Sequence, residues 1–253
     1  LGILLSRTVS GVVGEAFGWR EMYQLAAVSI AVITAIMWKV LPRFTVHSTL
    51  SYPSLMLSMA QLWQRYSTLR RAALAQGFLS IAFSAFWSTL AVMLSEHYHM
   101  GSAIAGAFGI AGAAGALAAP MAGHLADKVG AAKVTQLGAL LVTVSFALMF
   151  LLPALPVQGQ WLLIALSAVG FDLGLQSSLV AHQNLVYSLE PLARGRLNAL
   201  LFTMVFIGMA LGSVLGSQVY ALANWEGVVA LATFSSAIAL VIRLTGNPSL
   251  SKA

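Results

Sequence analysis

Eight long apolar runs, separated by short polar intervals, occupy most of the 253-residue chain. A helix needs about 20 mostly apolar residues to cross about 30 Å of hydrocarbon. The runs have about this length, so the pattern predicts eight transmembrane helices and an all-α, polytopic membrane fold. The predicted spans are residues 1–17, 22–41, 72–94, 102–122, 134–152, 161–181, 197–219 and 228–246.

The longest polar interval, residues 44–71, contains an amphipathic stretch. Five of its apolar residues recur at spacings of three and four, which places them on one helical face. This pattern predicts a short helix within residues 54–69. Two interpretations stay open: the helix lies on the membrane surface, or it is a linker helix packed on its own bundle. The five residues are Leu55, Met59, Leu62, Tyr66 and Leu69.

The other polar intervals predict turns at residues 18–21, 123–130, 182–196 and 224–227, and a polar tail at 247–253. The interval at 182–196 is a basic hinge between two apolar runs. His124 and His182 fall at the ends of spans, where we expect them to be solvated.

Composition supports the membrane class. Hydrophobic residues make up 59% of the chain and charged residues 8%, and the mean hydropathy is +0.88. Soluble domains carry about 25% charged residues. The net charge of +6 does not indicate nucleic-acid binding, because the basic residues lie in gaps between apolar runs and form no stripe with interleaved aromatic residues. The chain contains no Cys, no metal-ligand motif and no catalytic constellation, so we expect no metal, no cofactor and no enzyme activity.

The Lys and Arg residues predict the orientation. If residues 44–71 are cytoplasmic, eleven of these residues fall inside and only Arg20 falls outside, while Arg7 lies within the first span. Such an excess is the positive-inside pattern. It predicts a multi-pass inner-membrane protein with both chain ends in the cytoplasm. The eleven residues are Lys39, Arg43, Arg65, Arg70, Arg71, Lys128, Lys133, Arg194, Arg196, Arg243 and Lys252.

Asp172 is the main candidate for a functional residue, because it is a carboxylate within an apolar run. A charge at this depth costs about 2.5–3.5 kcal/mol on insertion scales and normally faces a protein interior or a water pathway. At 100° per residue, Gln176 and Gln183 lie within about 40° of Asp172, so the helix carries a polar stripe. One interpretation is a carboxylate that takes up and releases a proton; the other is a structural carboxylate that hydrogen-bonds a neighbouring helix.

Arg7 is the second charge within a predicted span. One interpretation makes it a counter-ion to Asp172 or a ligand for an anionic substrate. The other makes it an arginine whose side chain extends to the cytoplasmic surface.

Two sets of glycines predict close helix contacts. Gly11 and Gly14 share a helical face with Arg7 in the first span. Gly208, Gly212 and Gly216 recur every four residues in the seventh span.

Several motifs together resemble the major facilitator superfamily of secondary transporters, and most closely its bacterial drug and metabolite efflux branch. The resemblance runs along the whole chain in order. Its motifs are Gly11-x-x-Gly14 followed by Gly18-Trp19-Arg20, Gly123-x-Leu-Ala-Asp127-Lys128-x-Gly130, Asp172-Leu-Gly-Leu-Gln176, Pro191-x-Ala193-Arg194-x-Arg196-Leu-Asn198-Ala199, and Gly208 through Gly216.

The resemblance implies a domain organisation. The family has twelve spans, and this chain, which begins at Leu1, resembles spans five to twelve. Residues 1–43 would be the last two helices of the N-terminal bundle, 44–71 a cytoplasmic linker, 72–246 the C-terminal six-helix bundle and 247–253 a cytoplasmic tail. The partners would be a small-molecule substrate, the lipid bilayer and the four helices that the chain lacks.

The resemblance also implies a function, which is export of a small molecule in exchange for protons by alternating access. A proton gradient would supply the energy, and Asp172 and Gln176 would line the path. The alternative is a truncated, transport-inactive membrane protein that at most associates with other helices.

A gating loop is implied by the motif that ends at Gly130. Asp127 could pair with Arg194 or Arg196 in a cytoplasmic latch, or these residues could serve only as topology charges and a turn cap. Ala131-Ala132-Lys133 stands where the family usually has a basic pair, and this departure weakens the gating role.

Overall fold

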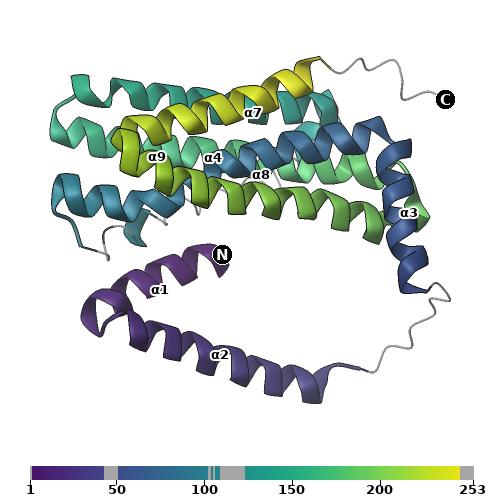
Figure 1. The fold of residues 1–253 in the computed structure, drawn as a ribbon, viewed down its shortest axis with the longest axis horizontal. Helices are drawn as coiled ribbons and strands as arrows, with labels where there is room; N and C mark the ends of the chain where they lie inside the picture. Colours follow the sequence, from purple (N-terminus) through teal and green to yellow (C-terminus); the bar gives the residue numbers. More distant parts are fainter. Residues whose placement is uncertain (1, 43–50, 102–103, 105, 109–122, 246–253) are drawn as a thin grey trace.

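The computed structural model describes residues 2–42, 51–101, 104, 106–108 and 123–245, and Figure 1 shows that helices account for this fold. The described residues contain no strand, which confirms the all-α class. The elements are α1 (Gly2–Ala16), α2 (Trp19–Val40), α3 (Tyr52–Arg65), α4 (Ser67–Tyr98), α7 (Ala131–Leu148), η1 (Met149–Ala154), α8 (Val157–Tyr187), η2 (Pro191–Ala193) and α9 (Arg194–Leu244).

Five stretches of the described chain are long and apolar enough to cross a membrane: Trp19–Val40, Ser67–Tyr98, Ala131–Ala154, Val157–Tyr187 and Pro191–Leu244. The last contains two helices, because Ala223 and Asn224 have non-helical dihedral angles that kink α9. The first predicted span corresponds to α1, which has only 15 residues. The predicted span at 102–122 lies largely outside the described residues. The polytopic membrane fold is therefore confirmed.

The seam between α4 and α9 is the tightest packing in the described bundle. A Cβ atom built on Gly208 would lie 2.2 Å from the carbonyl oxygen of Gly77, and one on Gly212 would lie 2.4 Å from that of Ile81. At Gly216 it would lie 2.8 Å from the Cα atom of Ala85. The three glycines thus let the backbones of two helices touch, which is how helices associate in lipid.

An aromatic cluster fills the centre of the bundle. Phe171 of α8 stacks on Phe146 of α7, with ring centroids 4.7 Å apart, and meets Phe86 of α4 edge-on at 4.8 Å. All three side chains are buried. Offset and edge-to-face ring contacts of this kind add to the packing energy beyond their area, so α4, α7 and α8 are joined at one point.

The α1–α2 hairpin lies beside this bundle (Figure 1). Gly18 separates the two helices with φ of 105°, a left-handed value that side chains rarely adopt. Among the side chains of α2, none is buried. Helix α2 corresponds to the second predicted span, 22–41, but it starts at Trp19, within the interval predicted as a turn.

Helix ends differ from prediction at the intervals 123–130 and 182–196. Residues 123–129 are helical, so the predicted turn at 123–130 is confined to Gly130, whose φ is 88°. The hinge predicted at 182–196 is shorter, because α8 continues to Tyr187 and α9 begins at Arg194. A membrane helix can extend beyond the hydrocarbon layer, whereas the length of an apolar run reflects only the thickness of that layer. Helix α8 is therefore longer than the run that predicted it.

The amphipathic stretch is also divided differently. Helix α3 ends at Arg65, Tyr66 has extended dihedral angles, and Leu69 belongs to α4. Leu62 is buried in a cluster with Leu69 and with Leu197 of α9. This packing favours the linker-helix interpretation over a helix that only rests on the membrane surface.

Candidate functional site

Asp172 lies at the midpoint of α8, with 15 helical residues before it and 15 after it (157–171 and 173–187). Its side chain is only 5% exposed. The midpoint of a membrane-spanning helix lies near the bilayer centre, where a carboxylate is most costly. The structure thus places this carboxylate inside protein, halfway along the helix.

Glycines on the opposite side of α8 explain how the helix is oriented. A Cβ atom on Gly174 would lie 2.6 Å from the carbonyl oxygen of Gly138, so this face contacts the α7 backbone directly. Asp172 is two residues away, about 200° around the helix. It therefore lies on the side of α8 turned away from α7.

The polar stripe continues toward the C-terminal end of α8. Gln176 is half-buried one turn after Asp172. Gln183 Nε2 donates hydrogen bonds to Tyr187 Oη at 3.3 Å and to Asn198 Oδ1 at 3.4 Å, and Tyr187 donates to Asn198 at 2.6 Å. Gln183 thus joins α8 to α9, while Gln176 stays closest to Asp172 along the stripe.

His182 was expected to be solvated, and this prediction is wrong. The side chain is fully buried, and its Nδ1 lies 2.9 Å from Oε1 of Gln76 on α4. Since α8 extends five residues beyond His182, the histidine is not at the end of the helix. The sequence carried one weak signal, a glutamine within the apolar run of α4, but nothing in it pairs two residues 106 positions apart.

A second buried polar group lies near His182, at the end of α9. Arg243 is 9% exposed, and its Nε donates to Thr135 Oγ1 of α7 at 2.9 Å. Gln136 Nε2 donates to the Arg243 carbonyl oxygen at 3.1 Å. The sequence pattern indicated only a role in membrane orientation for Arg243, yet its side chain holds α7 and α9 together.

The residues predicted to form a gate do not meet in this structure. Asp127 and Lys128 are exposed near the end of the helical stretch 123–129, and Gly123 is half-buried at its start. Arg194 is exposed, its Nε donates to the Tyr187 carbonyl oxygen at 3.4 Å, and Arg196 is half-buried. Across the described part of the chain, no ion pair joins Asp127 to either arginine, so the latch stays a prediction.

One tyrosine–glutamate pair secures the start of α4 at this end. Tyr66 Oη donates to Glu190 Oε2 at 3.0 Å. Loss of hydration, followed by this hydrogen bond to a carboxylate, raises the pKa of Tyr66 above its ordinary value of 10.0. Tyr66 therefore stays protonated at neutral pH and keeps the linker attached to the loop before α9.

The predicted N-terminal site residues are only partly described. Arg7 belongs to α1, but its side chain lies outside the described residues. Gly11 is buried and Gly14 half-buried on the same helix.

Comparison with known families decides the identity of the chain. The sequence model of the Major Facilitator Superfamily matches residues 1–186 of the chain and, in a second match, residues 72–252. The chain belongs to the Major Facilitator Superfamily. This membership agrees with the all-α membrane fold.

Relatives within the superfamily carry transporter names. "Uncharacterized transporter YgaY" of Escherichia coli O157:H7 is 33% identical over 232 residues, which cover 90% of this chain and 57% of the relative. "Probable transporter SCO4007" of Streptomyces coelicolor is 33% identical over 235 residues, which cover 91% of this chain and 53% of the relative. The chain thus spans little more than half the length of these relatives, and it is a transporter-family membrane protein.

Proposed function

We propose that this superfamily chain takes part in proton-coupled export of a small molecule, acting together with family helices that it does not itself contain. Two bundles would rock around a site at mid-membrane depth and expose it alternately to either side. Asp172 would carry the proton, and Gln176 would line the same path.

One observation carries this proposal, namely the burial of Asp172 at the midpoint of α8. A structural carboxylate could join helices anywhere along the bundle, but a proton carrier has to lie where it can communicate with both sides of the membrane. Intramembrane carboxylates are rare and commonly belong to ion or proton pathways. The glycine contact with α7 fixes the helix so that Asp172 and Gln176 share the face turned away from α7.

In the proposed orientation, α3 and the loop before α9 lie on the cytoplasmic side of a bacterial inner membrane. Both chain ends lie on the same side. The Lys and Arg distribution supports it. Alkaline phosphatase fused after Ser188 should be inactive, because this enzyme folds only outside the cytoplasm. Activity at that position would overturn the orientation.

Replacing Asp172 by Asn tests the proton role. With all twelve family helices present, in one polypeptide or as a complex, Asp172→Asn should abolish transport driven by a pH gradient and leave membrane insertion unchanged. The assay is fluorescence dequenching in inverted vesicles, using compounds that discharge the gradient with the parent protein. Glu21→Gln, a neutralised exposed carboxylate in the first turn of α2, should keep the activity.

An infrared pH titration of the purified chain tests the same role without a substrate. As pH falls, the parent should gain a protonated-acid carbonyl band that Asp172→Asn lacks, identified in the difference spectrum because the other carboxylates contribute equally to both proteins. If transport and the band both survive the substitution, the carboxylate is structural. The second candidate, a membrane protein that associates with other helices without transporting, would be favoured if no compound discharged the gradient with the parent protein.

A further inference from the structure

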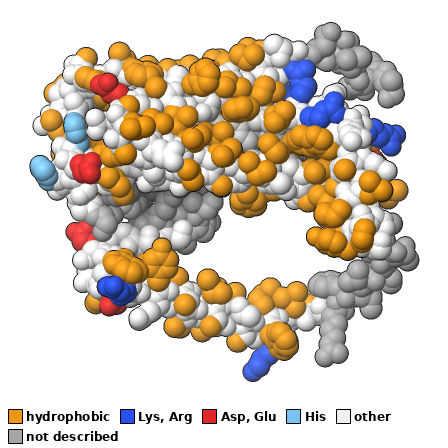
Figure 2. All heavy atoms as spheres, viewed as in Figure 1, with side chains coloured by type: hydrophobic (Ala, Val, Ile, Leu, Met, Phe, Trp, Pro, Cys, Tyr) orange, Lys and Arg blue, Asp and Glu red, His pale blue; other side chains and the backbone are white. Residues whose placement is uncertain are grey.

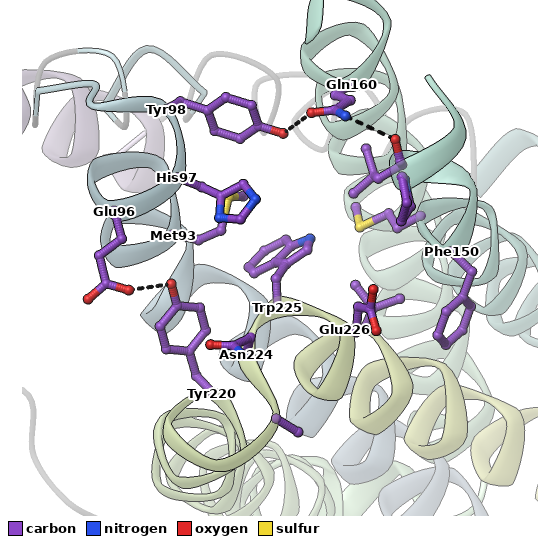
Figure 3. A pocket seen from close by; sticks show the side chains of 15 residues that line it. Met93, Glu96, His97, Tyr98, Phe150, Gln160, Tyr220, Asn224, Trp225 and Glu226 are labelled. Carbon is purple, nitrogen blue, oxygen red and sulfur yellow. Dashed lines mark hydrogen bonds between the residues drawn. The ribbon is translucent and has the colours of Figure 1, made fainter. Parts of the chain in front are cut away.

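A cavity of about 540 Å³ lies at the end of the bundle opposite α3, where α4 ends, α8 begins and α9 is kinked (Figure 3). Small-molecule sites in proteins commonly measure about 300–1,000 Å³. The cavity is separate from the candidate proton site. Its α8 residue, Gln160, precedes Asp172 by twelve residues, which is about 18 Å along a helix.

The cavity has an apolar floor and a polar rim. Met93, Met149 and Val229 form part of its lining and are at most 2% exposed. Glu96 and Glu226 also line it, but both side chains are exposed. A ligand that matches this gradient has an apolar body and a polar or charged group at one end.

Aromatic residues form its walls, and their positions are fixed. Trp225 packs against the buried Phe86 with ring centroids 5.5 Å apart. Tyr98 Oη donates to Gln160 Oε1 at 2.5 Å, and Gln160 Nε2 donates in turn to the Leu152 carbonyl oxygen at 3.1 Å. Figure 3 shows Tyr98, Trp225 and Tyr220 around the same space. Walls held in this way need little reordering when a ligand binds.

Two carboxylates and one histidine, His97, are among the residues that line the cavity. Glu96 and Glu226 are its carboxylates, and no Lys or Arg occurs among the described residues that line it. Glu96 Oε2 accepts a hydrogen bond from Tyr220 Oη at 2.8 Å, which orients this carboxylate. A helix resumes after the kink at Asn224, and its N-terminal dipole would attract an anion, but Glu226 lies in its first turn and offsets that field.

We propose that this cavity binds an amphiphilic organic cation. The apolar body would lie against Met93, Met149 and Val229, and the positive charge would lie at the rim between Glu96 and Glu226. Trp225 and the two tyrosines would add cation–π attraction, which is worth about 0.5–2 kcal/mol. This binding site goes beyond the proposed export function and does not depend on Asp172.

Tetraphenylphosphonium binding to the purified 253-residue chain in nanodiscs tests the proposal. Equilibrium dialysis of the radiolabelled cation, with empty nanodiscs subtracted, should give a saturable signal. Glu226→Gln and Glu96→Gln should each weaken binding by about three- to tenfold, because each removes one charge at a solvent-exposed rim. Tyr220→Phe should weaken it by about twofold, since it only frees the Glu96 side chain.

The chain supplies a matched control at its other end. Glu190 also accepts a hydrogen bond from a tyrosine, Tyr66, but it lies outside the cavity. Glu190→Gln should therefore leave the affinity unchanged. All variants should elute as the parent does in size-exclusion chromatography.

Tetraphenylborate has the shape of the cation with the opposite charge, and it should show no saturable binding. The proposal is wrong if the phosphonium does not saturate, if the borate binds as well or better, or if Glu190→Gln weakens binding as much as the rim variants do. A salt-dependent affinity that is lost stepwise in Glu96→Gln and Glu226→Gln would support it.

Discussion

Helices α2 and α4 are almost equally apolar, yet only one of them is packed. Their best membrane-length windows have mean hydropathies of 1.6 and 1.7, and the buried share is 0% for α2 and 61% for α4. Lipid is as apolar as a leucine side chain, so hydrophobicity drives both helices into a membrane but does not drive them against a neighbour. Insertion and packing are therefore set by different features of the sequence.

A glycine-lined contact distinguishes α4 from α2, although α2 also carries small residues at Ala27, Ala31 and Ala35. The α4 helix meets the glycine face of α9 with Gly77 and Ala85, and backbone reaches backbone. The sequence of α2 contains no glycine between Trp19 and Val40.

The charged residues divide the bundle in another way. Figure 2 shows Lys and Arg gathered on the drawn face at the α3 end of the bundle, with Asp, Glu and His at the opposite end.

The largest effect is expected at the α4–α9 seam. A leucine at position 208 would force its Cβ atom against the Gly77 carbonyl oxygen, which is backbone and cannot rotate away. We expect Gly208→Leu to cost about 3 kcal/mol or more, at or above the usual range for overpacking. That loss lowers the unfolding temperature of the purified chain by about 6–12 °C. Size-exclusion chromatography after heating measures it.

Gly195 provides the control for the same substitution. It lies in the first turn of α9, and nothing lies within 4 Å of a Cβ atom built there. Gly195→Leu should change the unfolding temperature by no more than about 2 °C. If both variants lowered the unfolding temperature equally, leucine would destabilise α9 at any position, and the result would not support a tight seam.

The sequence predicted this seam better than it predicted where the helices end. Glycines every four residues in an apolar run are a local signal for close packing, and Gly208, Gly212 and Gly216 lie at the contact. The break at Tyr66 has no such signal, because no capping side chain forms a hydrogen bond there. The predicted spacing of four and then three residues from Leu62 through Tyr66 to Leu69 ran through that break, since periodicity alone does not register one extended residue.

A smaller effect is expected in the aromatic cluster. Phe171→Ala removes the ring that stacks on Phe146 and meets Phe86. Soluble cores lose about 3–5 kcal/mol on such a change. We expect about 2–3 kcal/mol here, because the part that reflects transfer from water is reduced in lipid. Thermal unfolding in detergent should show the loss, and Phe171→Leu should recover part of it.

The candidate sites were predictable to different degrees. Asp172 was found because a single carboxylate in an apolar run is visible locally. His182 and Gln76 were not paired, because the contact joins residues 106 positions apart. The cation cavity was missed for the same reason, as its lining comes from the ends of α4, η1, α8 and the α9 kink. Such sites depend on how helices are packed together, which a single sequence does not show.

The smallest effect is expected on α2. Trp38 is 87% exposed and alanine favours the helix, so Trp38→Ala should shift the unfolding temperature of the bundle by less than about 1 °C. The contrast with Phe171→Ala separates packing from hydrophobicity, because both variants delete a large aromatic side chain. If Trp38→Ala destabilised the chain as strongly as Phe171→Ala, α2 would pack against protein in solution, for instance a second copy of the chain. Repeating the measurement over a range of protein concentrations would then identify that contact, since an intermolecular contact becomes weaker on dilution and an intramolecular one does not.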